Sequence, residues 1–292
     1  MILNDSHGSA APRGEDLLKT NGELALTFVG TGSAFSKKLF QNNLIIAKGE
    51  EHLLVDCGSR TPEALDLLGL SVNSIHTYLI THTHADHIGG LEEVMLLGRY
   101  VAKRKTRLVI TDKLKTILWN QSLKGGSAWN ESREGKPLGF DDYFNQARPS
   151  RVRGAERELC RIDLGGLELH LFRTKHIPDS ALGWEDSFPS YGVVIDRRIV
   201  FTSDTRYDPG LFPWLDSLFP IERIYHDVQM YTGGVHAGLD EIADLPASVK
   251  SMTWLMHYGD KGLEARDRVR NLGFAGLAEQ WVCYRFPATL RG

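Results

Sequence analysis

An apolar run that leads directly into a dense cluster of histidines is the feature that most constrains the fold. The stretch "YLITHTHADHIGGLEEV" places three histidines and one aspartate within six positions. Alternate side chains of an extended segment point to the same side, so His82, His84 and Asp86 are expected to lie together. Apolar residues then recur at helical spacing over residues 86–104, and the turn into that helix re-aims His87 towards the others. This part of the chain is therefore expected to form a strand, a ligand-rich turn and a helix.

The cluster has the chemistry of a metal site. Neutral imidazoles and carboxylates are ligands that zinc, manganese and iron accept. Four ligands this close cannot easily all bind one ion, because the geometry divides them into the pair His82 and His84 and the pair Asp86 and His87. We therefore expect two adjacent divalent metal ions, with zinc as the first choice and manganese or iron as alternatives. The competing interpretation is a polar loop with solvated histidines.

Further ligands are expected at the ends of three later strands. His176 comes shortly after the strand-like "LELHLF", Asp204 closes "IVFTSD", and His257 ends "SMTWLMH". Three metal-competent residues at three strand ends indicate one shared edge of the sheets. The histidines without this placement are expected to be structural or solvated: His7, His52, His76 and His170.

Composition excludes several classes of protein. A hydrophobic fraction of 42% and a net charge of −3 are ordinary for a soluble globular chain, and they exclude a strongly basic protein that coats nucleic acid. The cysteines are few, odd in number and widely spaced, which favours a reducing compartment. No apolar run approaches the roughly 18 residues needed to span a bilayer. We expect a cytoplasmic protein that does not associate with membranes.

Strand-like and helix-like runs alternate from residue 24 onwards, without an internal repeat or a linker. This pattern favours an α+β sandwich with helices outside. We expect residues 1–23 to be a poorly ordered leader and residues 24–292 to be a single domain. The segment 121–150 has no clear period, and a connection of that length is usually functional or disordered. Its aromatic residues suit two roles equally, a lid over a substrate or an arm that pairs two copies in a homodimer.

The run "THTHADHIGG" resembles the HxHxDH motif of the metallo-β-lactamase superfamily. The stretches "FVGTGSAFS", "LLVDCG", "HIPDSALGW", "IVFTSDT" and "MHYGD" stand around it in the order of that superfamily. The resemblance implies a four-layer αββα sandwich of the metallo-β-lactamase type, with the metals at the edge between the two sheets. It implies one metal on His82, His84 and His176, a second on Asp86, His87 and His257, and Asp204 as the bridge.

Within the superfamily, "FVGTGSA" and the aspartate in "FTSDT" are most similar to ribonuclease Z and its phosphodiesterase relatives. That branch carries a histidine in an "HST"-like stretch before a helix, and His236 in "GGVHAGLDEIADLP" has the corresponding place, as a candidate proton donor. The branch's "HEA" stretch reads "HDV" here, so Asp227 would replace the usual glutamate as the partner of His236. The sequence lacks the Gly/Pro-rich arm with which ribonuclease Z grips tRNA.

These observations predict a two-metal phosphodiesterase that hydrolyses a nucleotide or RNA phosphodiester, either a cyclic nucleotide or a short RNA 3′ end. A metal-bridging hydroxide would attack phosphorus while His236 protonates the leaving oxygen. Asp86 would act as a ligand or would orient the nucleophile. The basic runs 98–107 and 148–157 could steer phosphates. Three alternatives remain: a metal-dependent hydrolase of a lactone or thioester, a tRNA 3′-processing endonuclease, and a non-enzymatic metal-binding scaffold.

Overall fold

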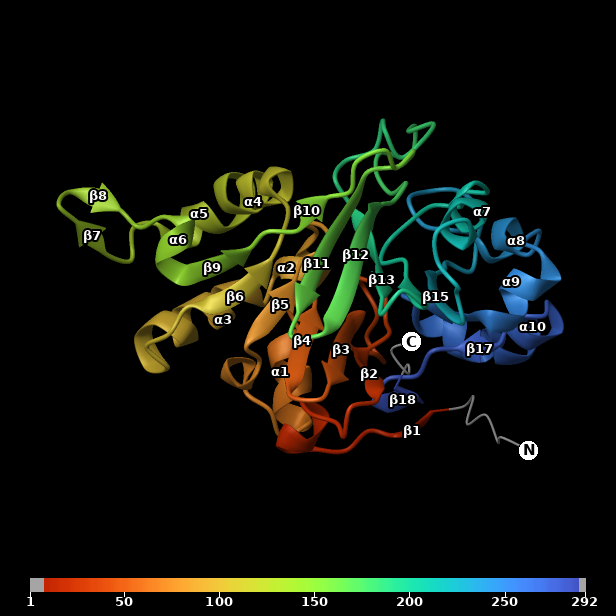
Figure 1. The fold of residues 1–292 in the computed structure, drawn as a ribbon, viewed down its shortest axis with the longest axis horizontal. Coiled ribbons are helices and arrows are strands. Elements are labelled where there is room, and N and C mark those ends of the chain that lie inside the picture. The colour runs from red at the N-terminus through yellow and green to blue at the C-terminus, as the bar shows by residue number, and fades with distance from the viewer. Residues whose placement is uncertain (1–7, 289–292) are drawn as a thin grey trace. The chain divides into compact units, whose positions relative to one another are not determined.

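The computed structural model describes residues 8–288, which form two compact units (Figure 1). The first unit contains residues up to 30, residues 40–148 and residues from 280 on, and the second contains residues 31–39 and 149–279. His7 lies outside the described residues. Each unit is built on its own eight-stranded sheet. The single domain expected over residues 24–292 stays a prediction.

The sheet of the first unit is antiparallel in one half and parallel in the other. Its strands, in spatial order, are β1 (Ser9–Ala10), β18 (Val282–Phe286), β2 (Leu24–Gly30), β3 (Asn43–Lys48), β4 (Glu51–Val55), β5 (Thr77–Leu79), β6 (Thr106–Val109) and β9 (Phe144–Ala147). The strands from β4 to β9 are parallel, and parallel neighbours require crossover connections. The crossover helices are α1 (Thr61–Leu67), α2 (Ala85–Ile88), α3 (Leu91–Leu96) and α4 (Asp112–Leu118). The carboxyl ends of β4 and β5 therefore meet at one edge of the sheet.

The helix expected over residues 86–104 is interrupted. It consists of α2, α3 and a π-helical turn, η3 (Leu97–Val101), and the break falls at Gly89 and Gly90. The backbone N–H of Gly90 donates to the carbonyl of Cys57, and a Cβ atom on Gly90 would lie 2.7 Å from the Cys57 sulfur. Close approach to the end of β4 thus replaces one continuous helix by two short ones.

Residues 8–23, which belong to the expected poorly ordered leader, contain regular structure, and the leader itself stays a prediction. Strand β1 pairs with β18, and a 3₁₀ turn, η1 (Gly14–Leu17), follows it. Leu17 and Leu18 are buried, which anchors this segment in the first unit. The strand that β1 pairs with comes from the other end of the chain, so the polar composition of the segment itself does not indicate this structure.

The segment 121–150 is also more regular than expected. It contains η4 (Trp119–Leu123) in part, α5 (Lys124–Ser127), a hairpin of β7 (Ser132–Arg133) and β8 (Lys136–Pro137), α6 (Phe140–Tyr143) and β9. Phe140, Tyr143 and Phe144 are buried, so these three aromatic side chains are not available to stack a base, whereas Trp129 is 73% exposed. Strand β9 of the segment thus belongs to the sheet of its unit, whereas the β7–β8 hairpin forms a separate two-stranded sheet that projects outwards (Figure 1).

The sheet of the second unit follows the chain order without a swap. Its strands are β10 (Ser150–Arg151), β11 (Leu159–Leu164), β12 (Leu167–Arg173), β13 (Tyr191–Ile195), β14 (Ile199–Phe201), β15 (Arg223–Asp227), β16 (Thr253–Met256) and β17 (Gly276–Leu277). The helices are α7 (Leu211–Asp216), α8 (Leu239–Ile242), α9 (Ala247–Met252) and α10 (Arg266–Asn271), with the 3₁₀ turn η5 (Asp260–Ala265). No helix within residues 8–288 is long and apolar enough to cross a membrane.

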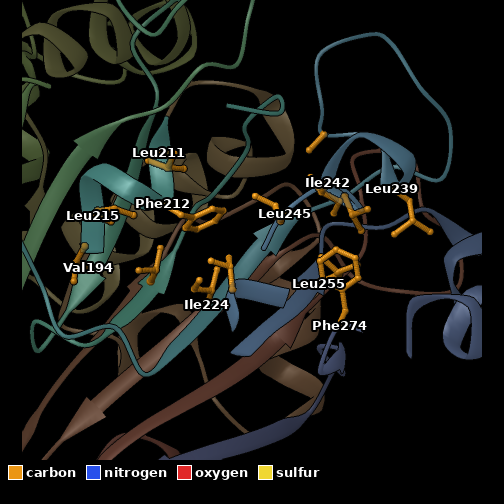
Figure 2. Close-up of a cluster of buried hydrophobic side chains, with 14 of the residues drawn as sticks. Val194, Leu211, Phe212, Leu215, Ile224, Leu239, Ile242, Leu245, Leu255 and Phe274 are labelled. Atoms are coloured by element: carbon orange, nitrogen blue, oxygen red, sulfur yellow. The ribbon is translucent and has the colours of Figure 1, made fainter. Parts of the chain in front are cut away.

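The core of the second unit lies between its sheet and these helices (Figure 2). Strand residues such as Val194, Ile224 and Leu255 pack with Phe212 of α7 and Ile242 of α8. Full burial of such a side chain stabilises a fold by about 1.5–3 kcal/mol. This packing holds the carboxyl ends of β14, β15 and β16 in place, which is where the polar residues of the candidate site lie.

Candidate metal centre

The seven predicted metal ligands are divided between the two units. His82, His84, Asp86 and His87 belong to the first, and His176, Asp204 and His257 belong to the second. In each unit they lie at the carboxyl ends of strands, the usual position of ligands in open sheets that contain parallel strands.

In the first unit the four residues form one compact set. The chain leaves β5 at Leu79, passes through His82 and His84, and enters α2. His82 Nε2 lies 3.1 Å from His84 Nδ1, and the ring centroids of His82 and His87 are 4.0 Å apart. Asp86 Oδ2 lies 3.4 Å from His87 Nε2. His82, Asp86 and His87 are buried, as a site that excludes water requires.

Asp56 organises this set, and the sequence analysis did not single it out. It follows β4 and accepts hydrogen bonds from the Thr81 backbone N–H at 2.8 Å, the Thr81 hydroxyl at 2.7 Å and His87 Nδ1 at 2.7 Å. The bond to His87 assigns the ring proton to Nδ1, so the Nε2 lone pair is the one available to a metal ion. Burial raises the pKa of Asp56, although His87 and Thr81 favour the charged form. The sequence signal was a carboxylate at the end of the apolar strand in "LLVDCG".

The topology of the second sheet explains why its distant residues meet. Strands β12 and β14 are both antiparallel to β13, and β14, β15 and β16 are parallel to one another. The carboxyl ends of β12, β14, β15 and β16 therefore lie at one edge. The residues found there are His176, Asp204, Asp227 and His257.

Asp204 is the centre of the second set. Its Oδ2 lies 3.7 Å from His176 Nε2, 3.5 Å from His257 Nε2 and 3.8 Å from His236 Nδ1. Asp204, His176 and His257 are almost completely buried. A hydrogen bond orients the ring of His176, whose Nδ1 donates to the Val235 carbonyl at 2.8 Å.

Asp227 contacts two of the histidines at once. Its Oδ2 accepts a hydrogen bond from His236 Nδ1 at 2.7 Å, and its Oδ1 lies 3.3 Å from His257 Nδ1. The backbone N–H of Thr205 also donates to Oδ2, at 2.9 Å. Burial alone would raise the pKa of Asp227, but His236 and His257 together outweigh it and the pKa is lowered. Burial likewise opposes the charged form of His236, but the Asp227 carboxylate outweighs it and raises that pKa.

Strained backbone accompanies both sets. Asp56, Ser203 and His257 have positive φ angles of 62°, 52° and 59°. Residues other than glycine rarely adopt the left-handed region of positive φ, and each residue that does so costs about 1–3 kcal/mol of stability. The three residues immediately follow, or lie close to, the ends of β4, β14 and β16, so each turn re-aims the chain where a polar side chain is presented.

The donor atoms fit divalent metal ions. Ligand atoms about 2 Å from a shared zinc ion are separated by roughly 3–3.5 Å. The Asp204–His257 distance of 3.5 Å and the His82–His84 distance of 3.1 Å agree with that spacing. Within the second unit, ligand atoms of Asp204, Asp227, His236 and His257 all lie within 4.8 Å of one another. The second unit therefore carries a candidate His/Asp metal-binding cluster.

Comparison with solved structures defines the class of protein. A diphosphatase from the PhnP family superimposes with a TM-score of 0.66 and 17% sequence identity, covering 90% of this chain and 98% of that one. The short form of human tRNase Z gives a TM-score of 0.59 and 19% identity, covering 90% and 99%. The chain has the metallo-β-lactamase fold, and the α+β fold class predicted from the sequence is confirmed.

Comparison of sequences is more specific. A family model described as "Anti-Pycsar protein Apyc1" matches residues 24–284. The protein of that name from Bacillus phage vB_BsuM-Goe3 is 39% identical over 260 residues, which cover 86% of this chain and 95% of the relative. The chain belongs to the Apyc1 family of anti-Pycsar proteins. It is an enzyme, a metal-dependent hydrolase, as the sequence predicts.

Proposed function

We propose that this enzyme is a two-metal phosphodiesterase that hydrolyses a nucleotide phosphodiester, with a cyclic nucleotide as the preferred substrate. The two sets of ligands would act as one centre, in the pattern implied by the metallo-β-lactamase resemblance. One ion would be held by His82, His84 and His176, the other by Asp86, His87 and His257, with Asp204 between them. Two bound ions would lower the pKa of water and neutralise charge on the phosphate oxygens.

The proposal depends mainly on the environment of His236. Its side chain is 21% exposed, whereas the side chains of Asp204, His176 and His257 are at most 1% exposed. It therefore combines access to a substrate with a hydrogen bond to the buried Asp227. An imidazole held in this way is suited to general acid catalysis rather than to a purely structural role.

The proton transfer follows from these contacts. Asp227 accepts from Nδ1 of His236 and stabilises the imidazolium form, which agrees with the raised pKa of His236. The second ring nitrogen, Nε2, would then donate its proton to the alkoxide that leaves phosphorus. Asp227 thus takes the place of the glutamate that partners this histidine in the ribonuclease Z branch. Asp86 would bind metal and, through its second oxygen, orient the attacking nucleophile.

The proposed substrate is small because the sequence lacks the arm with which ribonuclease Z grips tRNA. Zinc is the proposed metal, and the cytoplasm is the proposed location. The segment 121–150 retains two proposed roles, a lid over the substrate or an arm in a homodimer. Its one strongly exposed aromatic side chain, Trp129, is the residue through which either role would act.

The function is tested with protein loaded with Zn²⁺ or Mn²⁺ and two substrates in parallel, a 3′-extended tRNA and a mixture of 3′,5′-cyclic nucleotides. Turnover of the cyclic nucleotides alone would support the proposal. Cleavage of tRNA alone would replace it by the endonuclease alternative. Turnover of neither substrate would contradict the proposal and make a lactone and a thioester the next substrates to be measured. An Asp204→Ala variant controls for contaminating nucleases.

Substitution of His236 by alanine should lower kcat for the phosphodiester by about 10²–10⁴-fold, the usual contribution of a general acid. The measurement pairs steady-state kinetics with metal analysis. Metal content should remain that of the wild type, since His236 is not one of the seven proposed ligands. Unchanged kcat would remove the proton-donor role, and loss of metal would make His236 a ligand instead.

A further inference from the structure

The second unit contains a cavity of about 420 Å³ that has no role in the reaction as proposed above. His236 forms one part of its wall, and Lys175, Asp179, Arg206, Tyr207 and Glu241 are among the other lining residues. The volume falls within the range of about 300–1,000 Å³ typical of small-molecule sites. The cavity therefore adjoins the candidate proton donor and is large enough for an organic group.

Two cationic residues of this wall lie next to candidate ligands in the chain. Lys175 precedes His176 in the chain, and Arg206 lies two residues after Asp204. The backbone N–H of Arg206 donates to the Lys175 carbonyl, and its guanidinium donates to the Ala181 carbonyl at 2.9 Å. These contacts hold the guanidinium against the loop that follows His176. The cationic side of the cavity is thus positioned by the same strand ends that present the ligands.

Tyr207 supplies an aromatic surface. Its side chain is partly buried and packs against the hydrophobic core of the second unit. Burial raises the pKa of its hydroxyl, and Asp244, Asp208 and Glu241 act in the same direction, so the phenol is neutral. A partly buried neutral ring can stack on a flat ligand and also donate a hydrogen bond.

The chemistry of the wall discriminates among ligands. Lys175 and Arg206 are hydrogen-bond donors, whereas the carboxylates of Asp179 and Glu241 are acceptors. An apolar acyl chain in this cavity would desolvate charges of both signs without replacing their hydrogen bonds. A nucleoside offers a flat base together with donors and acceptors on its base edge and its ribose. The lining therefore favours a nucleoside over the acyl group of a lactone or thioester.

We infer that this cavity is the nucleoside subsite of the enzyme, in which the base stacks on Tyr207 while Lys175 and Arg206 donate to acceptor atoms of the base edge or the ribose. This inference rests on the proposed phosphodiesterase function and adds the part of the substrate that the second unit recognises. His236, at the wall, lies where the sugar joins the phosphate that is cleaved.

The test compares the wild type with Tyr207→Ala on two substrates. One is adenosine 3′,5′-cyclic monophosphate, and the other is methyl ribofuranoside 3′,5′-cyclic phosphate, which has the same phosphodiester ring but no base. Loss of a stacked base costs about 1–3 kcal/mol, so KM for the nucleotide should rise roughly 5- to 150-fold. The base-free ester should be affected far less. Tyr231→Ala is the matched control, because Tyr231 is 67% exposed and does not line the cavity.

A second variant and a binding measurement complete the test. Tyr207→Leu preserves apolar packing against the core but removes the ring, so it replaces Tyr207→Ala if that variant does not fold. Adenosine itself, which has no phosphate, is titrated calorimetrically into the metal-free wild type and variants. Wild-type binding that is lost with Tyr207 supports the subsite even if no cyclic nucleotide is hydrolysed, in which case only the proposed reaction fails. Absence of adenosine binding together with an unchanged KM in the variants overturns the inference and leaves the reaction standing.

Discussion

Asp56 is a buried carboxylate that binds the ligand-bearing loop of the first unit without being one of the predicted ligands. It accepts two hydrogen bonds from Thr81 and one from His87. Groups that orient a ligating histidine in this way commonly contribute about 10–100-fold to metal affinity. The fixed geometry of His82 and His87 therefore depends on a residue that comes from the preceding strand end.

Replacement of Asp56 by asparagine should lower metal affinity by about 10–100-fold, because an amide group cannot accept all three hydrogen bonds. Asparagine tolerates the positive φ of 62° at this position, so the backbone is not further strained. Competition with a chromophoric chelator measures the affinity. Asp66→Asn, an exposed change on α1, is the control. Equal affinities in the two variants would show that Asp56 does not orient the ligand.

His52 is a second residue-scale case, and it concerns stability. Its Nε2 accepts the backbone N–H of His76 at 3.2 Å, which requires a neutral ring. Burial, followed by the charge of His76, lowers the pKa of His52 from its ordinary value of 6.5. The unfolded chain therefore takes up this proton before the folded one, and stability falls as the pH drops below 6.5 towards the folded-state value.

Exchange of His52 for glutamine should reduce this loss of stability, since glutamine offers an acceptor that does not titrate. The free energy of unfolding in urea would be measured at several pH values between neutral and mildly acidic. We expect the wild type to lose more stability than the variant, up to about 1.4 kcal/mol for each unit by which the pKa is lowered. Parallel pH profiles for the two proteins would contradict this account of His52.

At the scale of elements, the second sheet depends on a close contact between neighbouring strands. Phe172 on β12 is paired with Gly192 on β13. A Cβ atom on Gly192 would lie 2.3 Å from Cζ of the Phe172 ring and 2.9 Å from the Thr202 carbonyl oxygen. The ring of Phe172 therefore occupies the space that a side chain at position 192 would need, and it belongs to the core behind the candidate ligands.

Gly192→Ala should consequently destabilise the protein by about 1–3 kcal/mol, the typical cost of overpacking a core. Urea denaturation gives the difference. Gly125→Ala provides a matched comparison, because no heavy atom lies within 4 Å of an added Cβ there and the residue lies in α5. That change should leave stability unchanged or raise it by about 0.4–1 kcal/mol. If both variants were equally stable, the Phe172 contact would not constrain the sheet.

The two sheets also show which parts of the fold a single sequence could give. The strand ends that carry His82, Asp204 and His257 were predictable, because short apolar runs bounded by polar residues have a local signal. The order of β1 and β18 in the first sheet was not, because Ser9 and Cys283 pair across nearly the whole chain. The burial of Phe140 likewise depends on partners that its own segment does not contain.

At the scale of the whole molecule, contacts between segments that are far apart in the sequence also limit what could be predicted of the candidate site. The predicted ligands were chosen from residue type and position at strand ends, and their identity stays a prediction. The contact between Asp227 and His236 followed only from the resemblance, because no local pattern links the end of β15 to the loop before α8. Asp56 escaped notice because a lone carboxylate at a strand end also occurs as an ordinary capping residue.

Removal of metal tests the consequence of these clusters for the whole chain. The buried carboxylates Asp204 and Asp227 lie among imidazoles that compensate their charge only in part, and a bound divalent ion would complete that compensation. A ligand present at 100 times its dissociation constant stabilises the folded state by about 2.7 kcal/mol. For a chain of 292 residues that corresponds to a rise in Tm of roughly 4–5 °C. We therefore expect a chelator to lower the Tm by this amount and added zinc to restore it, as followed by differential scanning calorimetry.

The Asp204→Ala variant is the control, and its Tm should not differ between the two conditions. A wild-type Tm that ignores both the chelator and zinc would mean that the clusters do not hold a metal ion.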